Sequence, residues 1–355
     1  MVNNEVGLAL SGGGYRAMLF HVGALQRLNE AGILSVLDRV SSVSGGSIIG
    51  LKLGLEWDRL HFVDGRATNV ENLVLRPIRH LARQSIDVRS AVAGRVPRRS
   101  GAQAVASHLD RHLFHGATLT DLPSAAPRFV TNATNLRSGK LLRFSKPYVA
   151  DYTEGQWHSP TTALADVAAA SAAFPPFLSP HRVKASGQFV PADGWVGDSP
   201  SHWLLTDGGV YDNLGLQTLD RFGTVLVSDG GFSLKRQADP SAMWSRQVRR
   251  IVTIMDQQVR SLRRRKIVGE LESGARQGAY WGINTDIDNY PVADPIRTNR
   301  KVDPAEVPTR LKKLSKEAIE AVVESGYTLC DSALRSHAPE LMGPNRNQSP
   351  KGLDV

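Results

Sequence analysis

The first fifty residues alternate short apolar runs with glycine-rich turns, and few folds accommodate this pattern. Residues 6–10 form an apolar run of strand length, and the next apolar side chains recur three and four residues apart until Gly32. Residues 39–43 are predicted to form a second strand, which SGGSIIG follows as the start of another apolar helix. A strand–helix–strand unit this compact places its two strands parallel and adjacent. The pattern therefore predicts an α/β fold around a mainly parallel sheet.

Two glycine-rich loops follow these two predicted strands. The first is Gly12-Gly13-Gly14 and the second is Ser44-Gly45-Gly46. Binding and catalytic sites of parallel α/β folds lie at the carboxyl ends of the strands. We therefore expect the two loops to face each other and to form a functional site.

Ser44 lies in SVSGG, between a predicted strand and a predicted helix. This arrangement is close to the G-x-S-x-G nucleophile elbow, with Ser42 in place of the first glycine. Gly45 and Gly46 would allow strand and helix to approach closely, and the helix N-terminus would favour a developing alkoxide. Ser-Gly-Gly is also an ordinary turn and helix cap, so the motif alone does not decide between the two functions.

The glycine triplet strengthens the catalytic interpretation. Acyl transfer through a serine passes through a tetrahedral oxyanion, which needs backbone N–H donors directed at it. Gly13 and Gly14, in a loop that begins at Gly12, are placed to supply them, and the absence of side chains would let the substrate carbonyl approach. The sequence therefore predicts an oxyanion loop opposite Ser44.

Two other enzyme or binding classes fit parts of the same pattern. GGGYRA also matches the G-x-G-x-x-A fingerprint of dinucleotide-binding proteins, which requires an acidic residue at the end of the second strand, whereas Asp38 precedes that strand. A Ser-His-Asp hydrolase would require a histidine after its acid, and after Asp207 only His337 remains. We consider both alternatives weaker than a serine hydrolase without histidine.

A carboxylate can serve as the base if it reaches the serine. Asp207 ends an apolar run and precedes Gly208 and Gly209, which permit a sharp turn, although a turn-capping role explains the spacing equally well. A second Asp-Gly-Gly, at Asp229, has the same local pattern. Spacing alone does not distinguish the two aspartates.

Four segments together resemble the patatin-like phospholipases. They are GGGYR at the first loop, SVSGG at the serine, ASAAFPPF at 170–177 and DGGVYDN at 207–213. The resemblance implies a three-layer α/β/α fold, hydrolysis of lipid acyl esters such as phospholipids, and a Ser–Asp dyad that needs no metal or other cofactor. By position, Ser44 would be the nucleophile, Asp207 the base and Arg16 the arginine beside the oxyanion loop. Asp229 lacks the DGGVYDN context.

Beyond these motifs, we expect one hydrolase domain over residues 1–335. Residues 61–125 are predicted to form a helical lid or side layer, and residues 244–277 a long basic amphipathic helix. The apolar stripe of that helix is expected to pack on the core. The polar, turn-rich tail at 340–355 is predicted to be disordered.

The net charge of +9 favours anionic partners. The run Arg263-Arg264-Arg265-Lys266 is a candidate contact with an anionic membrane surface, and catalysis would need no nucleic acid. We expect a cytoplasmic protein with peripheral contact at the inner membrane face, because no apolar run is long enough to span a bilayer and Cys330 is the single cysteine.

The thiol of Cys330 is expected to be buried and inert. A basic binding protein with a vestigial elbow remains the non-enzymatic alternative, and the pattern leaves open an activating ligand.

Overall fold

A computed structural model describes residues 3–86, 100–176, 178–231, 234 and 236–342. Its centre is a block of five parallel strands in the order β13-β12-β1-β2-β5. These are β13 (Gln277–Gly282), β12 (Phe222–Asp229), β1 (Asn3–Leu10), β2 (Arg39–Val43) and β5 (Arg128–Asn135). The predicted strands at 6–10 and 39–43 lie side by side in this block, which confirms the α/β class.

On the far side of β5 the sheet continues with antiparallel strands. They are β6 (Lys140–Phe144), β7 (Tyr148–Asp151), β8 (Gly155–His158) and β10 (Gln188–Pro191). Two further strands, β11 (His202–Asp207) and β9 (His181–Lys184), branch from β5. In the sequence, FVTNATNL (129–136) and KLLRF (140–144) predict a strand pair, which forms β5 and β6, and the apolar run that ends at Asp207 forms β11. Most of the remaining flank carries no such signal.

β2 and β11 pair with successive parts of the same edge of β5, and this arrangement brings the residues of the candidate site together. The first part of β5 pairs with β2, where Val43 lies opposite Asn132. At Ser44 the chain leaves the sheet to begin a helix, and β11 takes over the same edge of β5, with Asp207 opposite Ala133. The end of β2 and the end of β11 therefore meet at neighbouring residues of one strand.

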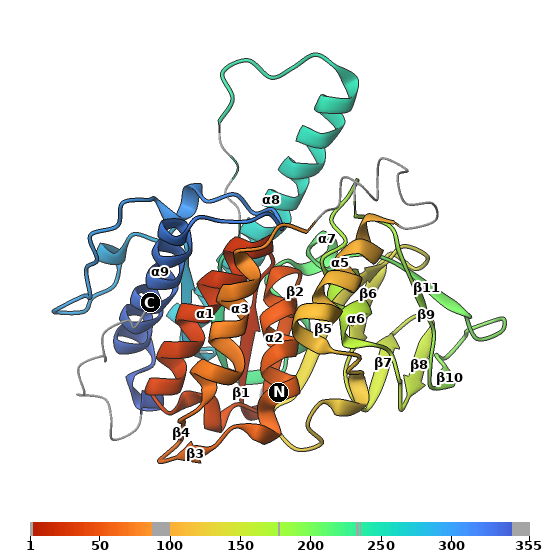
Figure 1. Ribbon diagram of the computed structural model, residues 1–355, viewed down its shortest axis with the longest axis horizontal. Helices are drawn as coiled ribbons and strands as arrows, with labels where there is room; N and C mark the ends of the chain where they lie inside the picture. Colours follow the sequence, from red (N-terminus) through yellow and green to blue (C-terminus); the bar gives the residue numbers. More distant parts are fainter. Residues whose placement is uncertain (1–2, 87–99, 177, 232–233, 235, 343–355) are drawn as a thin grey trace.

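Helices lie in front of the sheet in the view of Figure 1, and the end of one long helix packs on its other face. One face carries α1 (Gly14–Glu30), α2 (Gly45–Glu56) and α9 (Lys316–His337), with α1 packed along α9. Leu8, Leu10 and Leu226 belong to the large core under these helices. The alternate side chains Ala9, Val225 and Val227 belong to a smaller core on the other face, where Ile267 of α8 (Trp244–Glu272) packs. This alternation produces the three layers.

Residues 61–125 contain several short helices. Side chains of α3 (Arg76–Ala82) and α5 (Gly101–Leu109), such as Ile78 and Leu109, lie in the large core and thus form a side layer there. The chain also contains α6 (Leu164–Ser171) and α7 (Gly209–Asp212). The remaining short elements are β3 (Phe62–Val63), β4 (Arg66–Ala67) and turns of 3-10 or π helix at Ile33–Val36, Trp57–Arg59, Glu71–Leu75, Asp110–Phe114, Leu119–Asp121, Gln217–Leu219, Ile287–Asn289 and Pro304–Glu306. Part of the predicted segment, residues 87–99, and residues 343–355 of the predicted tail lie outside the described residues.

The long helix differs from its prediction in two respects. α8 ends at Glu272, and the unpredicted strand β13 begins at Gln277. The prediction that its apolar stripe packs on the core is wrong: Ile251, Met255, Val259 and Leu262 are 54%, 62%, 39% and 58% exposed. Only the C-terminal part of α8 is anchored on the sheet, and its first turns project beyond the body of the protein (Figure 1). Among the described residues, none of the helices is long and apolar enough to cross a bilayer.

Candidate active site

Ser44 has the backbone conformation of a nucleophile elbow. Its φ is 50° and its ψ is −118°, a strained combination for a residue with a Cβ, and it immediately precedes α2. Strain of this kind persists only where the surroundings over-determine it. Here the Ser44 amide donates a hydrogen bond of 2.8 Å to the hydroxyl of Ser171, and the Ser44 side chain lies in a nearly closed environment.

Asp207 faces Ser44 from the end of β11. The hydroxyl of Ser44 donates a hydrogen bond to the Asp207 carboxylate, and the amide of Gly209 donates another, of 2.7 Å, to Oδ1. The carboxylate is buried, and this burial raises its pKa from 3.8 to about 7, although both hydrogen bonds lower it. The negative charge of Asp256 on α8 raises the pKa further. The structure thus brings the two predicted residues together and makes Asp207 a stronger base than an exposed aspartate.

Ser171 is a site residue for which no role was predicted, although it lies within the ASAAFPPF motif. Its hydroxyl donates to the carbonyl of Asn132 (2.7 Å), accepts from the amide of Ser44 and contacts the hydroxyl of Ser47 (2.8 Å). Its own carbonyl accepts from the amide of Gly208 at 3.1 Å. Ser171 therefore holds the turn at Ser44 and the turn at Asp207 in a fixed relative position. The motif was the available signal, but its role depends on contacts between segments distant in sequence.

The glycine loop begins α1 beside the serine. Gly13 and Gly14 have φ values of 144° and 56°, and amides at the start of a helix have no partner within that helix. The Gly12 amide donates to the carbonyl of Asn213 (3.0 Å). Gly13 and Gly14 are therefore the candidate oxyanion donors. Gly12 lies against Ser44, and a Cβ added at Gly12 would lie 3.1 Å from the Cβ of Ser44.

The glycines also answer a packing need that the sequence did not reveal. A Cβ at Gly14 would lie 1.6 Å from the carbonyl oxygen of Thr309, and a Cβ at Gly45 would lie 2.1 Å from that of Gly14. Gly46 and Gly208 are likewise packed against main-chain carbonyl oxygens. The loops approach each other through their backbones. Glycine is needed here for this contact as well as for access of a substrate.

Arg16 holds the glycine loop in place through hydrogen bonds to neighbouring loops. Its side chain is buried and donates to the carbonyls of Gly230 (3.3 Å), Ala305 (2.8 Å) and Val307 (3.1 Å). Burial lowers the pKa of the guanidinium to about 10, so it stays charged at neutral pH. The predicted supporting arginine therefore holds the first turn of α1 against two other loops.

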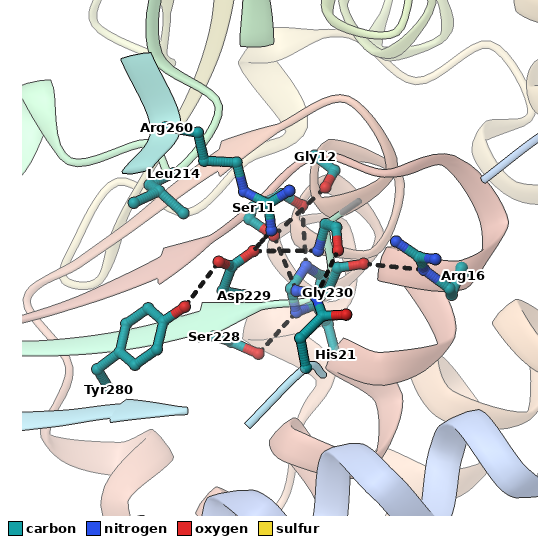
Figure 2. A network of polar contacts seen from close by, with 12 residues as sticks. Ser11, Gly12, Arg16, His21, Leu214, Ser228, Asp229, Gly230, Arg260 and Tyr280 are labelled. Atoms are coloured by element: carbon teal, nitrogen blue, oxygen red, sulfur yellow. Dashed lines mark hydrogen bonds and ion pairs between the residues drawn. The ribbon is translucent and has the colours of Figure 1, made fainter. Parts of the chain in front are cut away.

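Asp229 occupies a turn of the same form as Asp207 but has different partners (Figure 2). Its Oδ1 accepts from the amide of Gly231 (3.0 Å), it is ion-paired with Arg260 of α8, and the hydroxyl of Tyr280 donates to Oδ2 (2.8 Å). Arg260 lowers its pKa below the ordinary 3.8. Asp229 is thus a structural group that is charged at neutral pH, and the contacts distinguish it from Asp207.

The histidines and Asp38 are engaged elsewhere. His21 is buried between the hydroxyl of Ser228 (2.8 Å) and the carbonyl of Ser11 (2.9 Å), and burial lowers its pKa to about 4, which keeps it neutral. The ring of His337, at the end of α9, packs against Tyr290. Asp38 accepts a hydrogen bond from the amide of Val6, at the opposite end of β2 from the site. These contacts favour neither a histidine triad nor a ribose-binding carboxylate.

The basic run on α8 is divided by its contacts. Arg263 turns toward the protein, where it lies 3.6 Å from Asp212 and donates to the carbonyl of Tyr211 (3.2 Å). Arg264, Arg265 and Lys266 are exposed. Of the four predicted membrane-contact residues, Arg263 is therefore turned toward the protein. The other three remain candidates, although Lys266 also lies 3.7 Å from Glu270 on the same helix. Cys330 is buried as expected, and burial raises the pKa of its thiol well above the ordinary value.

The fold and the site together define an α/β protein with a strained serine elbow facing a buried aspartate. The model of the patatin-like phospholipase family matches residues 8–220, and the chain belongs to this family. A 49-residue stretch is 41% identical to the Saccharomyces cerevisiae protein "Putative meiotic phospholipase SPO1", covering 14% of this chain and 8% of that protein.

The fold is similar to that of human GIVD cytosolic phospholipase A2, with a TM-score of 0.53 at 13% identity over 92% of this chain and 60% of that one. The same human enzyme in complex with methyl gamma-linolenyl fluorophosphonate inhibitor and terbium chloride gives a TM-score of 0.53 at 14% identity, over 93% and 58% of the two chains. The chain thus spans less than two thirds of the length of these relatives.

Proposed function

We propose that the protein is a serine lipid acyl hydrolase of the phospholipase A or lysophospholipase type. The observation that carries the proposal is the hydrogen bond from the Ser44 hydroxyl to the buried Asp207, whose pKa of about 7 suits a general base at neutral pH. Membership of the patatin-like phospholipase family supports an acyl ester of a lipid as the substrate.

In the proposed acylation step, the hydroxyl oxygen of Ser44 attacks the carbonyl carbon of the ester, and Asp207 accepts the proton of that hydroxyl. The negative charge that develops on the carbonyl oxygen is stabilised by the amides of Gly13 and Gly14 and by the positive end of α1. The tetrahedral intermediate collapses to an acyl-serine. The departing alcohol takes the proton from Asp207, which is then ionised again.

In the proposed deacylation step, Asp207 removes a proton from water, and the resulting hydroxide attacks the acyl-serine. The same amides stabilise the second oxyanion. Collapse releases the fatty acid and returns the proton to Ser44. The chemistry is balanced with these residues alone.

Covalent labelling tests the nucleophile directly. A fluorophosphonate probe is expected to label the wild-type protein at Ser44 and to leave Ser44→Ala unlabelled. On a panel of phospholipids and lysophospholipids, Ser44→Ala should lose more than about 1000-fold in turnover while its circular dichroism spectrum is unchanged. A folded wild-type protein that neither reacts with the probe nor hydrolyses any lipid of the panel would support the vestigial binding protein instead.

We further propose that the substrate is met at an anionic membrane surface. The exposed residues Arg264, Arg265 and Lys266 support this, since each basic residue near such a surface contributes about 1 kcal/mol to binding.

A further inference from the structure

α8 exposes its apolar stripe, whereas an ordinary amphipathic surface helix buries it. Six of its apolar side chains recur every three or four residues and lie on one stripe, and these six are exposed. The stripe consists of Trp244, Val248, Ile251, Met255, Val259 and Leu262. Trp244, at the end remote from the sheet, is 76% exposed. A surface helix normally buries its apolar stripe against the core.

The opposite side of the helix is the one that contacts the protein. Arg260 is ion-paired with the buried Asp229, Arg263 reaches Asp212, and Ile267 lies in the smaller core. These residues fix the rotation of α8 about its axis. The stripe therefore faces away from the body along the part of the helix that projects from it (Figure 1).

The charges of the helix indicate what covers the stripe. Eight basic and three acidic residues lie between Trp244 and Glu272. Arg246, Arg264 and Arg265 are exposed, and the Lys266 side chain is 68% exposed. A second copy of the chain seated on the stripe would bring two such basic helices together. An anionic lipid surface instead offers acyl chains to the stripe and headgroups to the cations.

The helix also stands next to the candidate active site. Asp256, one residue after Met255, acts electrostatically on Asp207, and Arg263 donates to the carbonyl of Tyr211, close to the Asp207 turn. A lipid surface that holds the stripe would therefore lie near Ser44.

We propose that the projecting part of α8 is a lipid anchor: its stripe inserts among the acyl chains of an anionic membrane surface, and its arginines contact the headgroups. This inference rests on the proposed lipid hydrolase function, for which it specifies how the enzyme meets its substrate. The anchor orients the site toward the leaflet that supplies the ester.

Binding can be measured without catalysis in the Ser44→Ala background. This protein is expected to sediment with vesicles of three parts phosphatidylcholine and one part phosphatidylglycerol, and more weakly with phosphatidylcholine alone. Adding Val248→Gln, Ile251→Gln and Met255→Gln should weaken partitioning at least about 100-fold, since burying each such side chain contributes roughly tenfold in affinity. The melting temperature should not fall, because all three side chains are exposed.

The matched control replaces three exposed valines elsewhere on the surface, Val63, Val190 and Val196, by glutamine in the same background. It should bind vesicles as strongly as the parent. Insertion is read independently from Trp244, whose fluorescence should be quenched by a brominated phospholipid, and this quenching should be lost in Trp244→Phe.

Several outcomes would overturn the anchor. They are unchanged partitioning of the stripe variant, equal loss in the valine control, absence of quenching by the brominated lipid, and a dimer in sedimentation equilibrium that the stripe substitutions dissociate. Hydrolysis of a soluble ester without vesicle binding would also overturn it but would leave the proposed enzyme intact. Vesicle binding by a wild-type protein that hydrolyses no ester would instead contradict the proposed function and support the anchor.

Discussion

Replacing Asp207 by asparagine is expected to remove activity and to stabilise the fold. The folded-state pKa of Asp207, about 7, lies above its ordinary value of 3.8, because the carboxylate is buried. No cation is among the groups that set this pKa. Between about pH 4 and pH 7 the folded protein holds a proton that the unfolded chain has lost. Stability therefore falls as the pH rises through this window and levels off above it.

The magnitude follows from the size of the pKa difference. Since each pH unit is equivalent to about 1.4 kcal/mol, a rise from 3.8 to about 7 corresponds to about 4 kcal/mol of lost stability above pH 7. Asparagine carries no charge, and its carbonyl can still accept from the amide of Gly209. We expect Asp207→Asn to gain about 2 to 4 kcal/mol at pH 8, which raises the melting temperature by about 3 to 8 °C, and to gain little at pH 4.

The assay is thermal unfolding at pH 4, 6 and 8, with Asp229→Asn as the matched control. Asp229 has the same Asp-Gly-Gly turn, but Arg260 stabilises its charge, so Asp229→Asn removes a buried ion pair between these two residues. The control should lose about 3 to 5 kcal/mol at pH 8. The reasoning would be refuted if Asp207→Asn were less stable than the wild type at pH 8, or if its gain were the same at pH 4 and pH 8.

Three further predictions concern catalysis. With a soluble ester, kcat/KM should rise about tenfold per pH unit below the pKa of Asp207 and level off above about pH 7, whereas a flat profile from pH 5 to 8 would contradict Asp207 as the base. Gly13→Ala should lower turnover by about 100- to 1000-fold and should also lower the melting temperature, because alanine is strained at a φ of 144°; retention of wild-type turnover would exclude this loop as the oxyanion site. Ser171→Ala should lower kcat by more than tenfold at nearly unchanged KM, because it removes the hydrogen bond that holds the Ser44 amide. The control Ser47→Ala removes a contact to Ser171 but none to that amide, and it should keep most of the activity. Equal kcat values for the two variants would count against a positioning role for Ser171.

The local features of this fold were predictable from the sequence. The strand, glycine loop and helix at the N-terminus, and the strand that leads to Ser44, follow from short-range spacing and turn chemistry, which act between residues close in the chain. β6 and the strand ending at Asp207 were predicted for the same reason. The four motifs then indicated the family, because their order and spacing are specific even though each motif is common.

The assembly of the site required the tertiary structure. β5 pairs first with β2 and then with β11, and this change of partner brings Ser44 and Asp207 end to end. The two Asp-Gly-Gly turns are locally alike, and only their neighbours, Ser44 for Asp207 and Arg260 for Asp229, make one the candidate base and the other a charged structural group. The bridging role of Ser171 depends on the same long-range packing.

The sequence by itself determined that the helix after Asp229 has one apolar stripe and many cations, because helical periodicity is a local property. It did not determine which side of the helix meets the protein. Burial of apolar area favours the core in most proteins, and that expectation failed here: Arg260, Arg263 and Ile267 attach α8 to the body of the protein through its other side. A stripe records only that apolar atoms share a face, and the tertiary contacts of the remaining residues decide whether that face meets the core or is left exposed.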